Sequence, residues 1–124
     1  MKWCFCLISC LFFISAFSQS TYTSSYTQTW PTIFNTHVEE VKRSISFEEN
    51  AIILATETKS GKEMETFLIR NIEQNDEITE YSCLTRDNYR ITILKPLRNL
   101  MFIDIYRPSA KSGEEIQLRL HLDL

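Results

Sequence analysis

The clearest pattern in the chain is an alternation of aliphatic and polar side chains near its C-terminal end. From Ile116 to Asp123, an aliphatic residue at every even position alternates with a polar residue at every odd position. Successive side chains of a strand point to opposite faces, so this pattern predicts a strand with one buried face. On this pattern Leu120 faces the core, whereas Arg119 and His121 face solvent.

Similar segments precede it. From residue 44 onward, short runs rich in β-branched and aromatic residues are separated by turn residues at intervals of roughly 8–15 positions. No long helix and no internal repeat is indicated. The predicted strands cover residues 44–48, 51–58, 64–73, 77–85, 89–94, 100–107 and 116–122. We therefore expect an all-β fold, an antiparallel meander of seven or eight strands.

Two segments before residue 44 are ambiguous. Residues 19–29 contain only Ser, Thr, Tyr and Gln, which favours a spacer before a single β-rich domain at residues 30–124, with an edge strand as the alternative. Residues 36–43 favour one short helix near the N-terminus, because Thr36 and Glu39 have the spacing of a capping box. This segment is also short enough to belong to a strand.

A meander leaves two edge strands, and exposed edges tend to pair with other chains. Closure into a barrel removes both edges, and consecutive hairpins favour an up-and-down barrel. The expected architecture resembles the small barrels of the lipocalins, and a two-layer β-sandwich is the alternative. The resemblance is architectural, because Gln28 stands where the lipocalin Gly-X-Trp signature before Trp30 would need glycine.

Residues 1–18 have the organisation of a cleaved signal peptide. Lys2 is followed by an apolar stretch that reaches Phe17, and small residues precede a cleavage position between Ser18 and Gln19. The stretch is shorter than the roughly 20 residues that a membrane-spanning helix needs, so no membrane span is expected after cleavage. We expect a secreted or periplasmic protein, with a lipid anchor at Cys10 as the alternative.

Composition and charge narrow the range of partners. The formal net charge is −3 and charges of both signs are mixed along the chain, which argues against a nucleic-acid partner. Cleavage of the leader would remove three of the four cysteines and leave Cys83. The mature chain then has no internal disulfide, which with the absence of Asn-X-Ser/Thr sites suits a bacterial protein. Cys83 itself is expected to be a small buried hydrophobic residue in a strand.

No motif for catalysis, metal binding or nucleotide binding stands out. His37 and His121 lie far apart and lack the spacing of metal ligands, and the chain has only two glycines. Adjacent carboxylates lie near the predicted turns, where they are expected to be solvated. We therefore expect no enzyme activity, no catalytic residue, no metal and no cofactor.

Aromatic residues occur in nearly every predicted strand. Core packing accounts for each of them singly, but together they are able to line a barrel mouth or an apolar cavity. Charges within apolar strands, at Arg70 and Asp104, are either outward-facing residues or anchors for a ligand. The candidate ligand-binding residues are Trp30, Tyr81, Tyr89, Phe102 and Tyr106.

The expected function is binding of an apolar small molecule or a peptide, without catalysis. The alternative is an envelope-associated interaction, structural or inhibitor module with a packed core and no ligand cavity. Its partner would then be another envelope or extracellular protein. An internal cavity would distinguish the two.

The leader makes a direct prediction. The exported protein is expected to begin at or within about two residues of Gln19, because the small residues before it suit signal peptidase. Mass spectrometry of the exported protein measures this end. An intact Met1 or a lipid on Cys10 would contradict the prediction.

Overall fold

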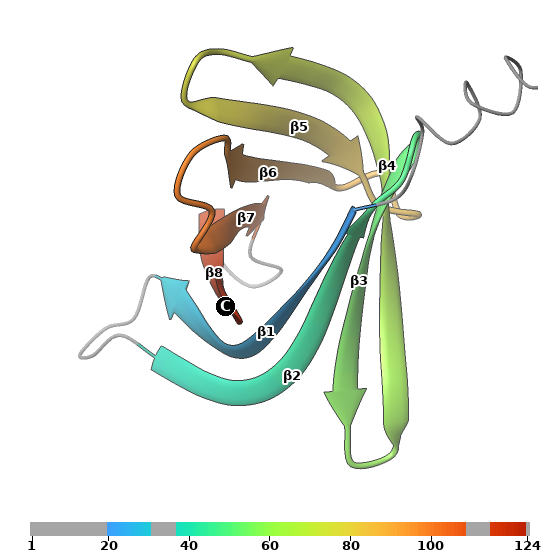
Figure 1. Ribbon diagram of the computed structural model, residues 1–124. Coiled ribbons are helices and arrows are strands. Elements are labelled where there is room, and N and C mark those ends of the chain that lie inside the picture. The colour runs from blue at the N-terminus through green and yellow to red at the C-terminus, as the bar shows by residue number, and fades with distance from the viewer. Residues whose placement is uncertain (1–19, 31–36, 109–114, 124) are drawn as a thin grey trace, which may run out of the picture.

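The computed structural model is a closed barrel of eight antiparallel strands, each joined to the next along the chain (Figure 1). The structure describes residues 20–30, 37–108 and 115–123, so the leader and Cys10 lie outside the described residues. The strands are β1 (Ser20–Trp30), β2 (His37–Phe47), β3 (Ala51–Thr58), β4 (Gly61–Gln74), β5 (Ile78–Leu84), β6 (Arg90–Pro96), β7 (Phe102–Pro108) and β8 (Glu115–Leu122). The all-β meander and its closure are thus confirmed, in preference to the sandwich.

The strand that closes the barrel is a correction to the sequence analysis. Residues 19–29 were expected to form a spacer, but from Ser20 onward they belong to β1, which pairs with both β2 and β8. Thr and Tyr suit the pleated surface of a sheet, and pairing on both sides satisfies the backbone polar groups. The small side chains of Ser24 and Thr27 are buried in this strand. The β-domain therefore begins before residue 30.

The short helix expected at residues 36–43 is a second correction. From His37 onward this segment belongs to β2, an eleven-residue strand that pairs with β1 and β3. Glu39, expected to cap a helix, instead forms an ion pair with Arg43 at 3.6 Å. Pairing with β1 from His37 onward, joined by pairing with β3 from Arg43 onward, outweighs a helix preference of two turns, because local propensity is weak beside tertiary contacts.

Aliphatic side chains fill the middle of the barrel. Leu120 is 1% exposed, as the alternation in β8 predicts, and Cys83 is buried as a small hydrophobic residue. The side chains of Leu118 and Leu122 are partly buried against the same cluster. The buried core consists of Ile45, Phe47, Ile52, Leu54, Phe67, Cys83, Ile91, Ile93, Ile103, Ile105 and Leu120.

Leu120→Ala is expected to lower the free energy of unfolding by about 2–5 kcal/mol, since it leaves a cavity in this packed interior. Denaturant titration measures the change. Leu68→Ala is the control, because Leu68 is 49% exposed and its truncation is expected to cost less than about 1 kcal/mol. Equal costs for the two variants would contradict the assignment of the core.

Candidate functional site

The five aromatic candidates do not form one site. Tyr81 faces the barrel interior, because it is paired with the buried Ile93 and directly opposed residues share a face. Tyr89 lies at one end of the barrel beside Ile91 and Arg107. Trp30, Phe102 and Tyr106 lie on the outer face. The structure brings Trp30 and Phe102 together, through Arg119, and separates them from Tyr81.

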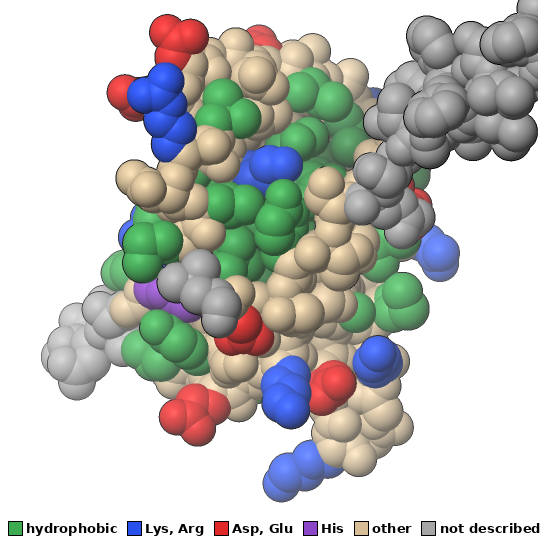
Figure 2. Space-filling view, viewed as in Figure 1, with side chains coloured by type: hydrophobic (Ala, Val, Ile, Leu, Met, Phe, Trp, Pro, Cys, Tyr) green, Lys and Arg blue, Asp and Glu red, His purple; other side chains and the backbone are tan. Residues whose placement is uncertain are grey.

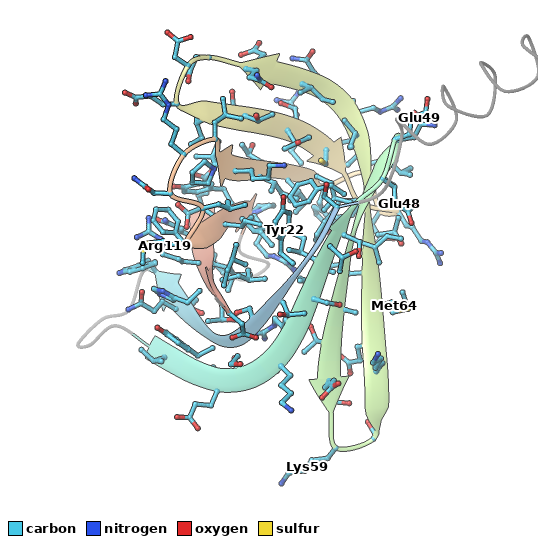
Figure 3. The ribbon with its side chains drawn as sticks, in the orientation of Figure 1. Tyr22, Glu48, Glu49, Lys59, Met64 and Arg119 are labelled. Atoms are coloured by element: carbon cyan, nitrogen blue, oxygen red, sulfur yellow. The ribbon has the colours of Figure 1, made fainter. Side chains whose placement is uncertain are left out.

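Inward-facing aromatic rings gather at one end of the barrel. In a closed meander every second turn lies at the same end, so the β2–β3, β4–β5 and β6–β7 turns share it; we call this end the Lys95 mouth. The ring of Tyr22 meets Phe47 edge-on at 5.9 Å between centroids, and Phe47 lies 5.1 Å from Tyr81. Figure 3 shows Tyr22 inside the ring of strands. Three strands, β1, β2 and β5, thus supply one aromatic group.

Lys95 brings a positive charge to these rings. On β6 it follows the buried Ile91 and Ile93 at the same two-residue spacing, so it points inward at the end of the strand. Its Nζ lies 4.8 Å from the centroid of Phe47 and 5.6 Å from that of Tyr22. Figure 2 shows Lys or Arg atoms surrounded by hydrophobic side chains in the middle of this face.

The rim of the Lys95 mouth also carries exposed apolar side chains. Ile72 of β4 is 51% exposed and stands opposite Tyr81, which places both on the inward face. Leu97 and Met101, in the β6–β7 turn, are exposed as well. A hydrogen bond joins this turn to the β4–β5 turn, because the backbone N–H of Leu97 donates to the carbonyl oxygen of Glu77 at 2.9 Å. Partly exposed apolar side chains therefore surround the charged group.

Burial raises the pKa of Tyr81, and the neighbouring Tyr22 and Cys83 add to this shift. Its phenol therefore stays protonated at neutral pH and keeps a hydroxyl that is able to donate a hydrogen bond.

The opposite end of the barrel, which we call the Arg107 mouth, carries its own ion pair. Nη2 of Arg107 donates to Oε1 of Glu65 at 2.9 Å, and the guanidinium lies 5.8 Å from the centroid of Phe67. Beside this pair is an open cleft of about 230 Å³ that Tyr89 and Pro108 also line. The inward-facing cation here already has its carboxylate partner.

The outer face of β1, β7 and β8 holds Arg119 in a fixed position. Its Nε and Nη2 donate to the two carboxylate oxygens of Asp104 at 2.8 and 3.0 Å. The guanidinium lies 3.9 Å from the centroid of Phe102 and 5.5 Å from that of Trp30. Arg119 was expected to lie free in solvent; it does face outward (Figure 3), but neighbouring strands enclose it. Asp104, outward by alternation, is only 5% exposed because Arg119 covers it.

His121 extends this outer cluster along β8. Its Nε2 is 2.6 Å from Oε1 of Gln28, and its ring stacks on Tyr26 at 4.6 Å between centroids. Burial, followed by the positive charge of Arg119, lowers the pKa of His121. At neutral pH the ring is therefore mostly uncharged. Figure 2 shows histidine atoms between hydrophobic side chains at the left of the view.

The thiol of Cys83 is poorly suited to act as a nucleophile. Burial raises the pKa of Cys83 to about 11, so its thiol is protonated at neutral pH and is a poor nucleophile. No group of three or more His, Cys, Asp or Glu residues is placed to hold a metal ion within the ranges that the structure describes. Among the same residues, no helix has the length and hydropathy needed to cross a membrane.

Comparison with protein-family models, with curated proteins and with solved structures gave no match. The sites are therefore interpreted from their geometry.

Sequence reasoning missed two of the residues at the Lys95 mouth. Tyr22 lies in the segment that was interpreted as a spacer, although the alternative of an edge strand would have placed it in the barrel. Lys95 was considered only as the residue before Pro96, where the strand stops. Extending the two-residue alternation beyond Ile91 and Ile93 would have shown that Lys95 points inward.

Arg119→Ala is expected to lower the free energy of unfolding by about 2 kcal/mol, because it leaves the buried carboxylate of Asp104 without its hydrogen-bond donors. The cost stays below that of a fully buried pair, since Arg119 is itself partly exposed. Arg70→Ala, at an exposed position, is the control and is expected to change stability by no more than about 0.5 kcal/mol. Denaturant titration compares the two. A change in unfolding free energy in Arg119→Ala no larger than in the control would show that the Arg119–Asp104 ion pair contributes nothing to stability.

Proposed function

We propose that the protein is a secreted or periplasmic, non-enzymatic binding protein that takes an apolar small molecule, or the apolar side chains of a peptide, at the Lys95 mouth. The supporting observation is the group of inward-facing apolar side chains that stay partly exposed at this end, above all Tyr22, Tyr81 and Ile72. Ligand sites are mostly apolar with a few polar groups, and this mouth has that composition.

Because the barrel core is filled, such a ligand would lie at the end of the barrel and not deep inside it. Phe67, Ile93 and Ile105 are fully buried in the middle of the barrel, so a deep calyx of the lipocalin kind would require these side chains to move. A ligand at the mouth needs no such movement, because it covers rings that are already accessible. Removing apolar surface from water gives about 25 cal/mol for each Å² covered. The lipocalin-like part of the proposal is therefore limited to binding at one end of a barrel.

Export and the lack of catalysis belong to the same proposal. The organisation of residues 1–18 favours a cleaved leader. The raised pKa of Cys83 keeps its thiol protonated, and Cys83 points into the barrel whereas His121 lies on the outer face, so the two are not placed to act as nucleophile and base.

The outer cluster favours a second candidate, an interaction module with a packed core. Trp, Tyr and Arg dominate the energetics of protein interfaces, and Trp30, Tyr26 and Arg119 lie together on this face with Phe102. Their fixed positions would reduce the entropy cost of association.

The two candidates differ in how they respond to an uncharged apolar ligand. 1-Decanol is expected to bind the purified protein, and Ile72→Ser is expected to weaken binding about fivefold, because it removes an apolar contact at the rim. Leu68→Ser is a matched control, since Leu68 lies on the same strand with nearly the same exposure, 49% against 51%, but faces outward. Isothermal titration calorimetry measures both affinities.

Equal effects of Ile72→Ser and Leu68→Ser would show that the Lys95 mouth is not the binding site. Failure of the folded protein to bind 1-decanol, together with failure to bind its charged analogue decanoate, would contradict the proposed function and leave the outer-face interaction module as the remaining candidate.

A further inference from the structure

Lys95 differs from the other cations that face the barrel interior in what it is paired with. Arg43 has a carboxylate partner in Glu39 at 3.6 Å, and Arg107 has one in Glu65 at 2.9 Å. Within residues 20–30, 37–108 and 115–123, no carboxylate lies within 4.0 Å of the ammonium of Lys95, and the contacts of this group are the rings of Phe47 and Tyr22. Among the described residues, the ammonium of Lys95 thus has no direct carboxylate partner, and the carboxylates of this mouth, Glu48, Glu49, Asp76 and Glu77, lie in its turns.

Aromatic rings compensate such a charge only in part. A cation over a ring is attracted only by the quadrupole of the ring, whereas a carboxylate carries a full negative charge and also accepts charge-assisted hydrogen bonds. An ammonium has three donors, and a ring face satisfies them poorly. Because Lys95 is partly buried, an anion that reaches it would meet less competition from water than it would at an exposed lysine.

The surroundings of Lys95 restrict the rest of the ligand. One ammonium matches one negative charge, and the formal net charge of −3 on the chain disfavours ligands with several negative charges. The side chains of Tyr22, Tyr81 and Ile72 offer apolar surface beside the charge. The site therefore combines a single cation with an apolar wall.

We propose, building on the function proposed above, that the ligand is a small amphiphilic monoanion, an aliphatic carboxylate whose charged group pairs with the ammonium of Lys95 and whose chain covers the rings of Tyr22 and Tyr81. The carboxylate lies at the end of β6, and the chain extends over the rim at Ile72. No covalent step is involved.

Decanoate and 1-decanol test this assignment, because they share a chain length and differ in charge at neutral pH. Decanoate is expected to bind the purified protein about tenfold more tightly than 1-decanol, as one charge-assisted pair would give. Lys95→Met keeps the length and the apolar stem of the side chain and removes the charge. It is expected to weaken decanoate binding about tenfold and to leave the affinity for 1-decanol within about twofold, whereas Lys95→Arg retains most of the preference.

Lys59→Met is the matched control for loss of one positive charge, because Lys59 lies in the β3–β4 turn at the other end of the barrel (Figure 3). It is expected to change neither affinity. Isothermal titration calorimetry at low ionic strength measures all four proteins, and a thermal unfolding curve for each shows that it is folded.

The outcomes distinguish failure of the carboxylate assignment from failure of the proposed function on which it rests. Equal binding of decanoate and 1-decanol, or an equal loss of decanoate affinity in Lys95→Met and Lys59→Met, would overturn the carboxylate assignment while the proposed function stands. Failure of both ligands to bind the folded protein would overturn both.

Discussion

The pairing of β1 with β8 is the contact on which the remaining structure depends. It joins segments from the two ends of the domain, with Thr27 opposite Leu120 and Trp30 opposite Gln117. A meander has two edges, and this one pairing removes both of them. β1 also contributes to both candidate sites, because it brings Tyr22 to the Lys95 mouth and Trp30 to the outer cluster around Arg119.

An irregularity within β1 decides which of its aromatic residues serve which site. Residues four apart in a regular strand lie on the same face, so Tyr22 and Tyr26 would both point inward. The register shifts between Ser24 and Tyr26 against both neighbouring strands, as at a β-bulge. After the shift, Tyr26 stacks on His121 on the outer face, whereas Tyr22 packs on Phe47 inside. This irregularity thus divides the strand between an inner and an outer cluster.

The distribution of charge follows from the filled core. Fully buried aliphatic residues such as Ile52 and Ile103 leave no room for ions in the middle of the barrel, so inward-facing charges lie toward its two ends. At one end Arg107 and Glu65 neutralise each other, and at the other Lys95 lies against aromatic rings. Because the strands hold these side chains in place, a ligand at either mouth would meet a preformed surface.

The sequence alone determined the features that depend on a period of two within one strand. It predicted the strands from residue 51 onward, the burial of Leu120 and Cys83, and an outward direction for Arg119. Only the tertiary structure decided that residues 20–30 form a strand, that residues from 37 onward are not helical, and that Arg119 meets Asp104 and Trp30. These features depend on backbone and side-chain partners in other strands. Local alternation shows which face a side chain occupies, but the register between distant strands decides which side chains meet there.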